Sequence, residues 1–284
     1  MNQRTLGPAG PPVSAVGLGG MYLSITGRPE ESAAIHTIHA ALDAGVTLVD
    51  TADVYCLDES DIGHNERLVA KALAGRAERV TVATKGGLRR PRGAWTRDAR
   101  PEHLVAACEA SLRALGVATI DVYQLHAPDS AVPFAESVGA LARLREQGKV
   151  KWVGLSNVSA AELAEASRIV PVASVQNRWN PGDRSPERDG VLAACTAAGI
   201  AFLPYSPFGG ASGALALGQR KGLAAEAARR GMSPHRLVLA WMLAKSPVVI
   251  AIPGARRETS ARDSAAAADV VLSAADVTAI EASF

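Results

Sequence analysis

Four polar residues of this chain follow short apolar runs on three successive units of the sequence: Asp50, Tyr55, Lys85 and His126. An ammonium group beside a phenol favours the phenolate and lowers the pKa of the phenol, so Tyr55 near Lys85 is a candidate acid. A carboxylate such as Asp50 can hold the ammonium in place, and a histidine can donate a hydrogen bond to a carbonyl oxygen. Together these residue types predict proton transfer to the oxygen of a carbonyl compound.

The elements that must position these residues are short strands alternating with helices. Eight runs rich in Val, Ile and Leu predict strands at residues 16–18, 46–49, 80–83, 120–125, 152–155, 172–175, 200–203 and 248–252. Segments with helical apolar spacing lie between them, at residues 33–42, 104–115, 134–144, 161–169, 190–198 and 237–243. Glycines that favour a left-handed helix end precede the next strand at Gly45, Gly116, Gly148 and Gly199. Because the strands are apolar on both faces, we expect a parallel sheet.

Eight strand and helix units with no linker-like stretch predict a closed (β/α)8 TIM barrel, an α/β fold. We expect a single barrel domain over residues 1–284, with a short N-terminal β-hairpin within residues 4–15 and a C-terminal helix. Functional residues of such barrels gather at the carboxyl ends of the strands. Asp50, Lys85 and His126 fall at such ends, and Tyr55 lies five residues beyond Asp50, close enough for one loop to return it to the barrel axis.

An open dinucleotide-binding sheet is the natural alternative, since Gly17-Leu18-Gly19-Gly20 follows an apolar start. The third glycine of that fingerprint would fall at Tyr22, and no acidic residue closes a strand about 20 residues later. We interpret these glycines as a tight turn after the first barrel strand, where Gly20 and Met21 let the backbone approach a ligand. A turn without a ligand is the alternative interpretation.

The composition favours a soluble, cytoplasmic protein. With 48% hydrophobic residues among 284, the chain can bury a large core, and no apolar run approaches the roughly 20 residues that span a bilayer. The net charge of +2 provides no strong field for nucleic acid binding. Cys56, Cys108 and Cys195 match neither a disulfide framework nor a zinc site, and His36 and His39 lack a third ligand. We therefore expect no nucleic acid, membrane or metal partner.

Seven short motifs occur in order along the chain: Asp50-Thr51-Ala52-Asp53-Val54-Tyr55, Gly63-His64-Asn65-Glu66, Thr84-Lys85, Leu125-His126, Gly154-Leu155-Ser156-Asn157, Gln176-Asn177 and Tyr205-Ser206-Pro207. In order and spacing, from about Arg4 to the C-terminal helix, they resemble those of the aldo-keto reductase superfamily. The resemblance implies an oxidoreductase that reduces an aldehyde or ketone to an alcohol with NADPH. Tyr55 is then the proton donor, Lys85 paired with Asp50 adjusts its pKa, and His126 orients the carbonyl as a neutral imidazole.

The cofactor half of the site has its own residues. The polar groups of Ser156, Asn157 and Gln176 match a nicotinamide carboxamide, and Tyr205 resembles the family's aromatic residue that stacks on the nicotinamide ring. Arg256 and Arg257 open a helix whose N-terminus attracts phosphate, which favours NADP(H) over NAD(H). The expected cofactor contacts are Gly20, Met21, Asp50, Ser156, Asn157, Gln176, Tyr205, Ser206, Pro207, Phe208, Gly209, Gly254, Arg256 and Arg257.

Several residues depart from the family pattern. Cys56 stands where glycine usually follows the tyrosine. In the last cofactor segment Glu258, Thr259 and Ser264 replace the common Pro, Glu and Asn. Because serine offers fewer hydrogen-bonding groups than asparagine, these changes weaken the expected adenine contact and the preference for NADP(H).

The substrate side is less defined by the sequence. We expect Tyr22, Trp95 and Trp179, with Met21 and Phe208, to form an apolar wall opposite the nicotinamide, although core packing is an equal alternative for each. Five arginines surround Trp95 in one loop. They mark either a solvated loop or a substrate rim for anionic or sugar-like groups, and they are Arg89, Arg90, Arg92, Arg97 and Arg100.

Two other functions remain open at this point. A barrel that binds NADPH as a sensor or regulatory subunit would keep the cofactor residues with little turnover. A Schiff-base lyase would use Lys85 as its nucleophile, but it leaves Ser156, Asn157, Gln176 and Tyr205 without a role. For the reductase we expect a small-molecule carbonyl substrate and a monomer or small homo-oligomer.

Overall fold

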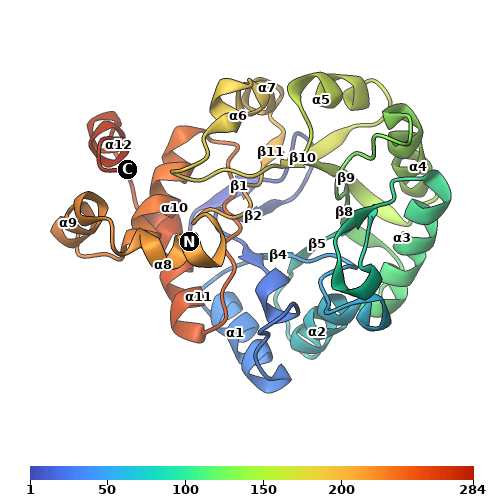
Figure 1. Cartoon of the computed structure of the whole chain (residues 1–284), viewed down its shortest axis with the longest axis horizontal. Helices are drawn as coiled ribbons and strands as arrows, with labels where there is room; N and C mark the ends of the chain where they lie inside the picture. Colours follow the sequence, from blue (N-terminus) through green and yellow to red (C-terminus); the bar gives the residue numbers. More distant parts are fainter.

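A ring of parallel strands forms the centre of the computed structural model, which describes all 284 residues (Figure 1). Seven strands pair in the order β11-β10-β9-β8-β5-β4-β3. In chain order they are β3 (Leu18–Gly19), β4 (Leu48–Asp50), β5 (Thr81–Gly86), β8 (Ile120–Leu125), β9 (Val150–Ser156), β10 (Val172–Gln176) and β11 (Ala201–Phe202).

The eighth predicted strand closes the ring. On one side the Phe202 amide donates to the Val248 carbonyl at 2.8 Å, and on the other the Gly17 amide donates to the Ala251 carbonyl at 2.8 Å. Parallel bridges join Val16 to Ala251 and Phe202 to Val249. The predicted (β/α)8 barrel is confirmed, although this last segment is paired by isolated bridges rather than by a regular strand.

The chain has twelve α-helices, most of which surround the ring on its outer side (Figure 1). They are α1 (Glu31–Asp43), α2 (His64–Leu73), α3 (Pro101–Leu115), α4 (Phe134–Glu146), α5 (Ala160–Ser167), α6 (Ser185–Arg188), α7 (Val191–Ala198), α8 (Gly210–Leu217), α9 (Lys221–Arg229), α10 (Pro234–Lys245), α11 (Glu258–Ala265) and α12 (Ala274–Glu281). All six helices predicted from apolar spacing are present, and α12 is the expected C-terminal helix. No helix is long and apolar enough to cross a membrane.

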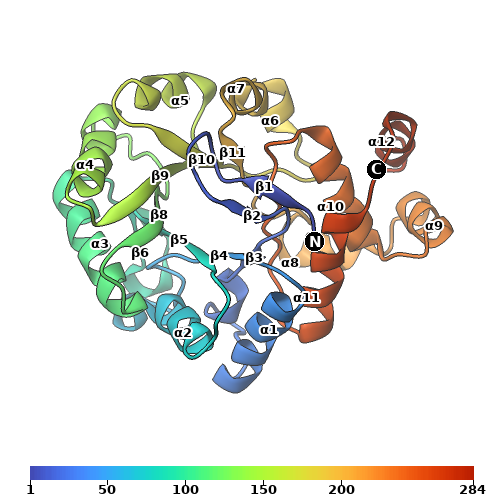
Figure 2. The same cartoon turned by 180° about the vertical axis from the view of Figure 1, so that it is seen from behind.

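A small antiparallel hairpin covers the amino ends of the barrel strands (Figure 2). It pairs β1 (Gln3–Thr5) with β2 (Pro12–Ser14), as predicted. Its Leu6 and Val13 pack into a fully buried cluster with residues of the barrel strands and their continuations, among them Leu48, Ala83, Val122, Leu203 and Ile250. That end of the barrel is therefore filled by apolar side chains.

Candidate active site

Neighbouring parallel strands bring the four predicted polar residues to the same end of the barrel. Asp50 ends β4, Lys85 lies in β5, and His126 follows β8. The register pairs Asp50 with Ala83 and Lys85 with Gln124, so Lys85 lies two positions beyond the partner of Asp50 and His126 two beyond the partner of Lys85, all at the carboxyl ends of adjacent strands. Tyr55 returns toward the barrel on the loop after β4, and it is buried like the other three.

Lys85 is the centre of this group and is fully buried, with 0% of its surface exposed. Its Nζ donates to Asp50 Oδ2 at 2.7 Å, to the Thr51 carbonyl at 2.8 Å and to the Tyr55 hydroxyl at 3.0 Å. Burial alone would lower the pKa of Lys85, but the charge of Asp50 and the hydrogen bonds to Asp50 and Tyr55 raise it above its ordinary value. The lysine is therefore an ammonium whose three N–H bonds are all used.

The pKa of Tyr55 is raised because burial disfavours the phenolate. The Lys85 ammonium acts in the opposite direction and Asp50 adds to the rise. The lowering effect predicted for Lys85 is present, but burial outweighs it. Tyr55 is thus a neutral phenol that already accepts one charged hydrogen bond at its oxygen.

His126 faces Tyr55 edge-on, with ring centroids 5.8 Å apart and an interplanar angle of 80°. Burial, with a smaller contribution from the Lys85 charge, holds the pKa of His126 well below its ordinary value. Its Nδ1 is buried without a hydrogen-bond partner. The imidazole is therefore neutral, as the sequence predicts.

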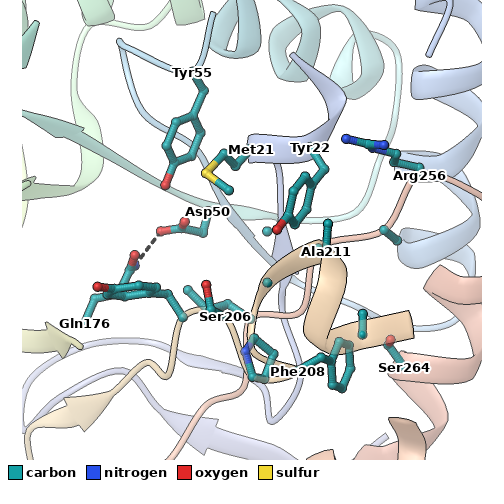
Figure 3. Close-up of a pocket in the computed structure, with 18 of the residues that line it drawn as sticks. Met21, Tyr22, Asp50, Tyr55, Gln176, Ser206, Phe208, Ala211, Arg256 and Ser264 are labelled. Atoms are coloured by element: carbon teal, nitrogen blue, oxygen red, sulfur yellow. Dashed lines mark hydrogen bonds between the residues drawn. The ribbon is translucent and has the colours of Figure 1, made fainter. Parts of the chain in front are cut away.

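Asp50 connects this group to the neighbouring strands through its second oxygen. Its Oδ1 accepts from Gln176 Nε2 at 2.8 Å, as Figure 3 shows, and from Gln124 Nε2 at 3.3 Å. The contact with Gln176 uses the amide nitrogen and leaves the amide oxygen available to a ligand. One chain of hydrogen bonds thus links β10 to Tyr55.

Asn157 braces the end of β9 rather than presenting a free amide. Its backbone adopts a left-handed conformation at φ 60°. Its Nδ2 donates to the His126 carbonyl at 2.9 Å and to Ser156 Oγ at 3.0 Å, and its Oδ1 accepts from the Tyr205 hydroxyl at 2.8 Å. The side chain of Asn157 therefore fixes Tyr205 and Ser156, both of which line the adjoining cavity.

A cavity of about 860 Å³ opens at this end of the barrel (Figure 3). Most predicted site residues line it: Met21, Tyr22, Asp50, Tyr55, Trp95, His126, Ser156, Asn157, Gln176, Tyr205, Ser206, Pro207, Phe208, Gly254, Arg256 and Arg257. Lys85 lies behind Asp50 and Tyr55 and does not reach the surface of the cavity.

The far end of the cavity is formed by the start of α11 and the loop after β3. Arg257 is the residue before this helix, and no side chain caps its first amides. The Arg256 guanidinium lies over the Tyr22 ring, 5.2 Å from its centroid. Gly254 is necessary there, because a Cβ at that position would lie 2.7 Å from Tyr22 Cδ2. This end offers two arginines and unsatisfied helix amides to an anion.

Three predicted contacts do not line the cavity. Trp179 was expected on the substrate wall, but it is 0% exposed and packs 5.2 Å from the ring of Trp241. Its indole nitrogen donates to Glu187 at 3.0 Å. The core therefore buries the apolar ring and also provides an acceptor for its one N–H group. Gly20 is buried under the Asn65 amide and Gly209 precedes α8, so their neighbours Gly19 and Gly210 line the cavity instead.

Of the five arginines that could form a substrate rim, only Arg97 lines the cavity. Several other lining residues were not predicted from the sequence: Gly19, Leu88, Ala127, Gly210, Ala211, Ala214, Leu215, His235, Ile252, Ala255, Ser260 and Asp263. Four of them belong to α8, whose Gly- and Ala-rich sequence has no clear apolar period and gives no helix signal. His235 follows Ser233-Pro234, a recognisable helix start, but a histidine there carries no chemical signature.

Comparison with known proteins agrees with this arrangement. The model of the Aldo/keto reductase family matches residues 15–283. The glycerol dehydrogenase AKR11B4 from Gluconobacter oxydans is 29% identical, with 99% of this chain and 94% of that chain covered and a TM-score of 0.81. The thermostable aldo-keto reductase Tm1743, in complex with epalrestat, is 28% identical over 100% of both chains, with a TM-score of 0.85. An aldo-keto reductase from Klebsiella pneumoniae in complex with NADPH is 27% identical, with 99% and 95% covered and a TM-score of 0.84.

Proposed function

This chain belongs to the aldo/keto reductase family, and we propose on that basis that it reduces an aldehyde or ketone to an alcohol with NADPH. The observation that carries the proposal is the buried contact of Lys85 Nζ with both Asp50 and the Tyr55 hydroxyl, directly behind the wall that these two residues form in a cavity of about 860 Å³. Tyr55 is the proton donor in this proposal, and Lys85 and Asp50 hold its hydroxyl in place.

The cavity fits a phosphorylated dinucleotide. Gln176 and Ser156 line it near Asp50 and offer an amide oxygen and a hydroxyl to a carboxamide, and Tyr205 beside them offers an aromatic face. Arg256, Arg257 and the uncapped start of α11 lie at the other end, where phosphates are favoured. NADPH, when bound, supplies the hydride.

The proposed reaction is balanced by one proton from the protein. The Tyr55 hydroxyl gives its proton to the carbonyl oxygen while the carbonyl carbon gains the hydride, so that the alcohol and NADP⁺ are formed. Lys85 stabilises the phenolate that is left, because its ammonium lies 3.0 Å from that oxygen. Neutral His126, which lines the cavity beside Tyr55, donates a hydrogen bond to the same carbonyl oxygen.

A Schiff-base mechanism on Lys85 has little support from the geometry. A lysine nucleophile must be unprotonated, whereas Asp50 and Tyr55 raise the pKa of Lys85. Its Nζ is also buried behind Asp50 and Tyr55, out of reach of a substrate in the cavity.

The reductase is tested by following reduced nicotinamide absorbance with a panel of aldehydes and the variant Tyr55→Phe. We expect the variant to lose about 10²–10⁴-fold in kcat, the usual contribution of a positioned acid, while it still binds NADPH in a fluorescence titration. Wild-type turnover by Tyr55→Phe would refute the assignment of the proton donor. NADPH binding without turnover of any aldehyde by the wild type would instead indicate a sensor.

A further inference from the structure

A short hairpin that follows β5 forms one wall of the cavity beside Tyr55. It pairs β6 (Leu88–Arg89) with β7 (Thr96–Arg97). Arg90 anchors this hairpin to the loop after β4. The residue is 4% exposed, and its guanidinium lies 3.9 Å from the Trp95 ring centroid. Its Nη2 donates to the Cys56 and Leu57 carbonyls. Trp95 is thereby held edge-on to Tyr55, with 6.4 Å between ring centroids. The hairpin is a fixed wall of the cavity, because its arginine is used to anchor it.

Arg97 differs from the other arginines of this hairpin, because it lines the cavity and its guanidinium has no hydrogen bond or ion pair. The adjacent carboxylate does not neutralise it. Asp98 is buried and is bound by Arg100 through two hydrogen bonds of 2.7 and 2.8 Å, with Arg89 3.6 Å away. The Arg100 contact also keeps the pKa of Asp98 below its ordinary value, so this anion is fully satisfied by its own partners.

The remaining charges around the cavity are also accounted for. Of the two carboxylates that line it, Asp50 is paired with Lys85 and Asp263 with Arg236. His126 is neutral because its pKa lies well below its ordinary value. Near Tyr55 two guanidinium groups have no ion pair. Arg90 is buried against Trp95 with its Nε and Nη1 unpartnered, and it does not line the cavity. Arg97 does line the cavity, so its charge is the one that a ligand near Tyr55 can contact, and it is well separated in the sequence from the phosphate-binding pair proposed at α11.

We propose that the substrate carries an anionic group, a carboxylate or a phosphate, on the same molecule as the carbonyl that Tyr55 protonates, and that Arg97 binds this anion. A guanidinium presents paired N–H donors that match either oxyanion. The hairpin fixes the backbone of Arg97 on the same cavity wall as Trp95, and the exposed side chain of Arg97 is free of other partners and can turn toward a bound anion. The inference rests on the proposed reductase function and adds the class of substrate to it.

The test compares two aldehydes of nearly the same shape, 4-formylbenzoate and its uncharged methyl ester, in kcat/KM with NADPH. We expect the ratio of the two values to favour the anion, and to fall about tenfold in Arg97→Gln, the loss expected for one charge-assisted hydrogen bond. The ratio cancels any loss common to both substrates. Arg92→Gln removes a charge from the same hairpin outside the cavity and should leave the ratio unchanged, while Arg97→Lys should restore part of it.

A second pair, glyceraldehyde 3-phosphate and glyceraldehyde, distinguishes phosphate from carboxylate as the preferred anion. Ratios near one for both pairs, or ratios that Arg97→Gln does not change, would overturn the inference and leave the reductase function intact. If no aldehyde is reduced, the reductase function itself fails. The anion preference is then measured by quenching of tryptophan fluorescence with 4-formylbenzoate and its ester, since Trp95 lines the cavity, and equal affinities would overturn the inference.

Discussion

At the scale of single residues, the site contains the neutral phenol of Tyr55 and the neutral imidazole of His126, which contact each other edge-on. The buried Lys85 ammonium donates to the phenol oxygen. Burial of Tyr55 and His126 moves the pKa of each away from neutrality, upward for the phenol and downward for the imidazole. The same low-polarity environment strengthens the contact of Lys85 with Asp50. The protonation state needed for reduction is therefore set by the protein at ordinary pH.

This predicts the pH dependence of aldehyde reduction. The reacting form has Tyr55 protonated, and the pKa of Tyr55 lies above its ordinary value of 10.0, so kcat/KM should be flat through neutrality and fall only above about pH 10. His126 should add no inflection near pH 6.5, because its pKa lies well below that value. The measurement is a profile of kcat/KM against pH. A rise or fall centred between about pH 6 and 8 would contradict these assignments.

At the scale of elements, the predictions that succeeded depended on the spacing of apolar residues and on the glycines that end helices. Parallel strands and amphipathic helices have clear apolar patterns, so the barrel and the strand ends that carry Asp50, Lys85 and His126 could be predicted. Contacts made by large side chains could not. Trp179 follows β10 much as Tyr205 follows β11, yet Trp179 turns into the core and Tyr205 lines the cavity. Tertiary contacts distinguish them: Trp179 packs on Trp241 and donates to Glu187, and Tyr205 donates to Asn157.

The N-terminal hairpin is held by Arg4, which supplies donors to the last turn of α10. Its guanidinium donates to the carbonyls of Leu243 and Ser246 at 2.6 Å, and burial lowers its pKa to about 10. We expect Arg4→Ala to lower the free energy of unfolding by about 2 kcal/mol, since buried carbonyls lose their partners. Urea denaturation measures this, with Arg113→Ala as an exposed control. Equal midpoints for the two variants would show that the hairpin is held by apolar contacts alone.

The buried contact of Glu66 in α2 with Thr84 in β5 predicts that replacing this carboxylate stabilises the protein to a degree that depends on pH. Glu66 accepts from Thr84 at 2.6 Å, its other oxygen is buried without a partner, and burial raises its pKa above 4.5. A raised pKa means that the folded state binds the proton more tightly, so the stability from Glu66 is present below pH 4.5 and lost as pH rises through the folded value. Glu66→Gln should therefore raise the thermal midpoint at pH 8 and change it less at pH 5.

The control for this variant is Glu146→Gln, an exposed carboxylate of α4 without an ion pair. It should leave both midpoints unchanged. If Glu66→Gln lowers the midpoint at pH 8, the ionised carboxylate stabilises the contact and the direction of the pKa shift assigned to Glu66 is wrong.

At the scale of the whole molecule, we propose that residues 1–284 fold as one domain, because segments near the C-terminus complete the barrel that the N-terminal strands begin. The segment at 248–254 completes the ring between β11 and β3, and α12 is tied back by Glu281. One oxygen of Glu281 accepts from Lys245 at 2.7 Å, from the Trp241 indole at 3.0 Å and from Arg184 at 3.0 Å. The C-terminal helix thus takes part in the same packed unit as α10.

The final prediction follows from that connection. Glu281→Ala leaves the buried Trp241 indole without its acceptor, whereas Lys245 and Arg184 lose one anion and keep Glu187, so the free energy of unfolding should fall by about 2 kcal/mol. Because the proposed domain is one cooperative unit, far-ultraviolet and tryptophan-fluorescence transitions should move together, and those of the exposed control Glu146→Ala should not move. Two separated transitions in the variant, one at the wild-type midpoint, would show that the C-terminal helix unfolds independently of the barrel.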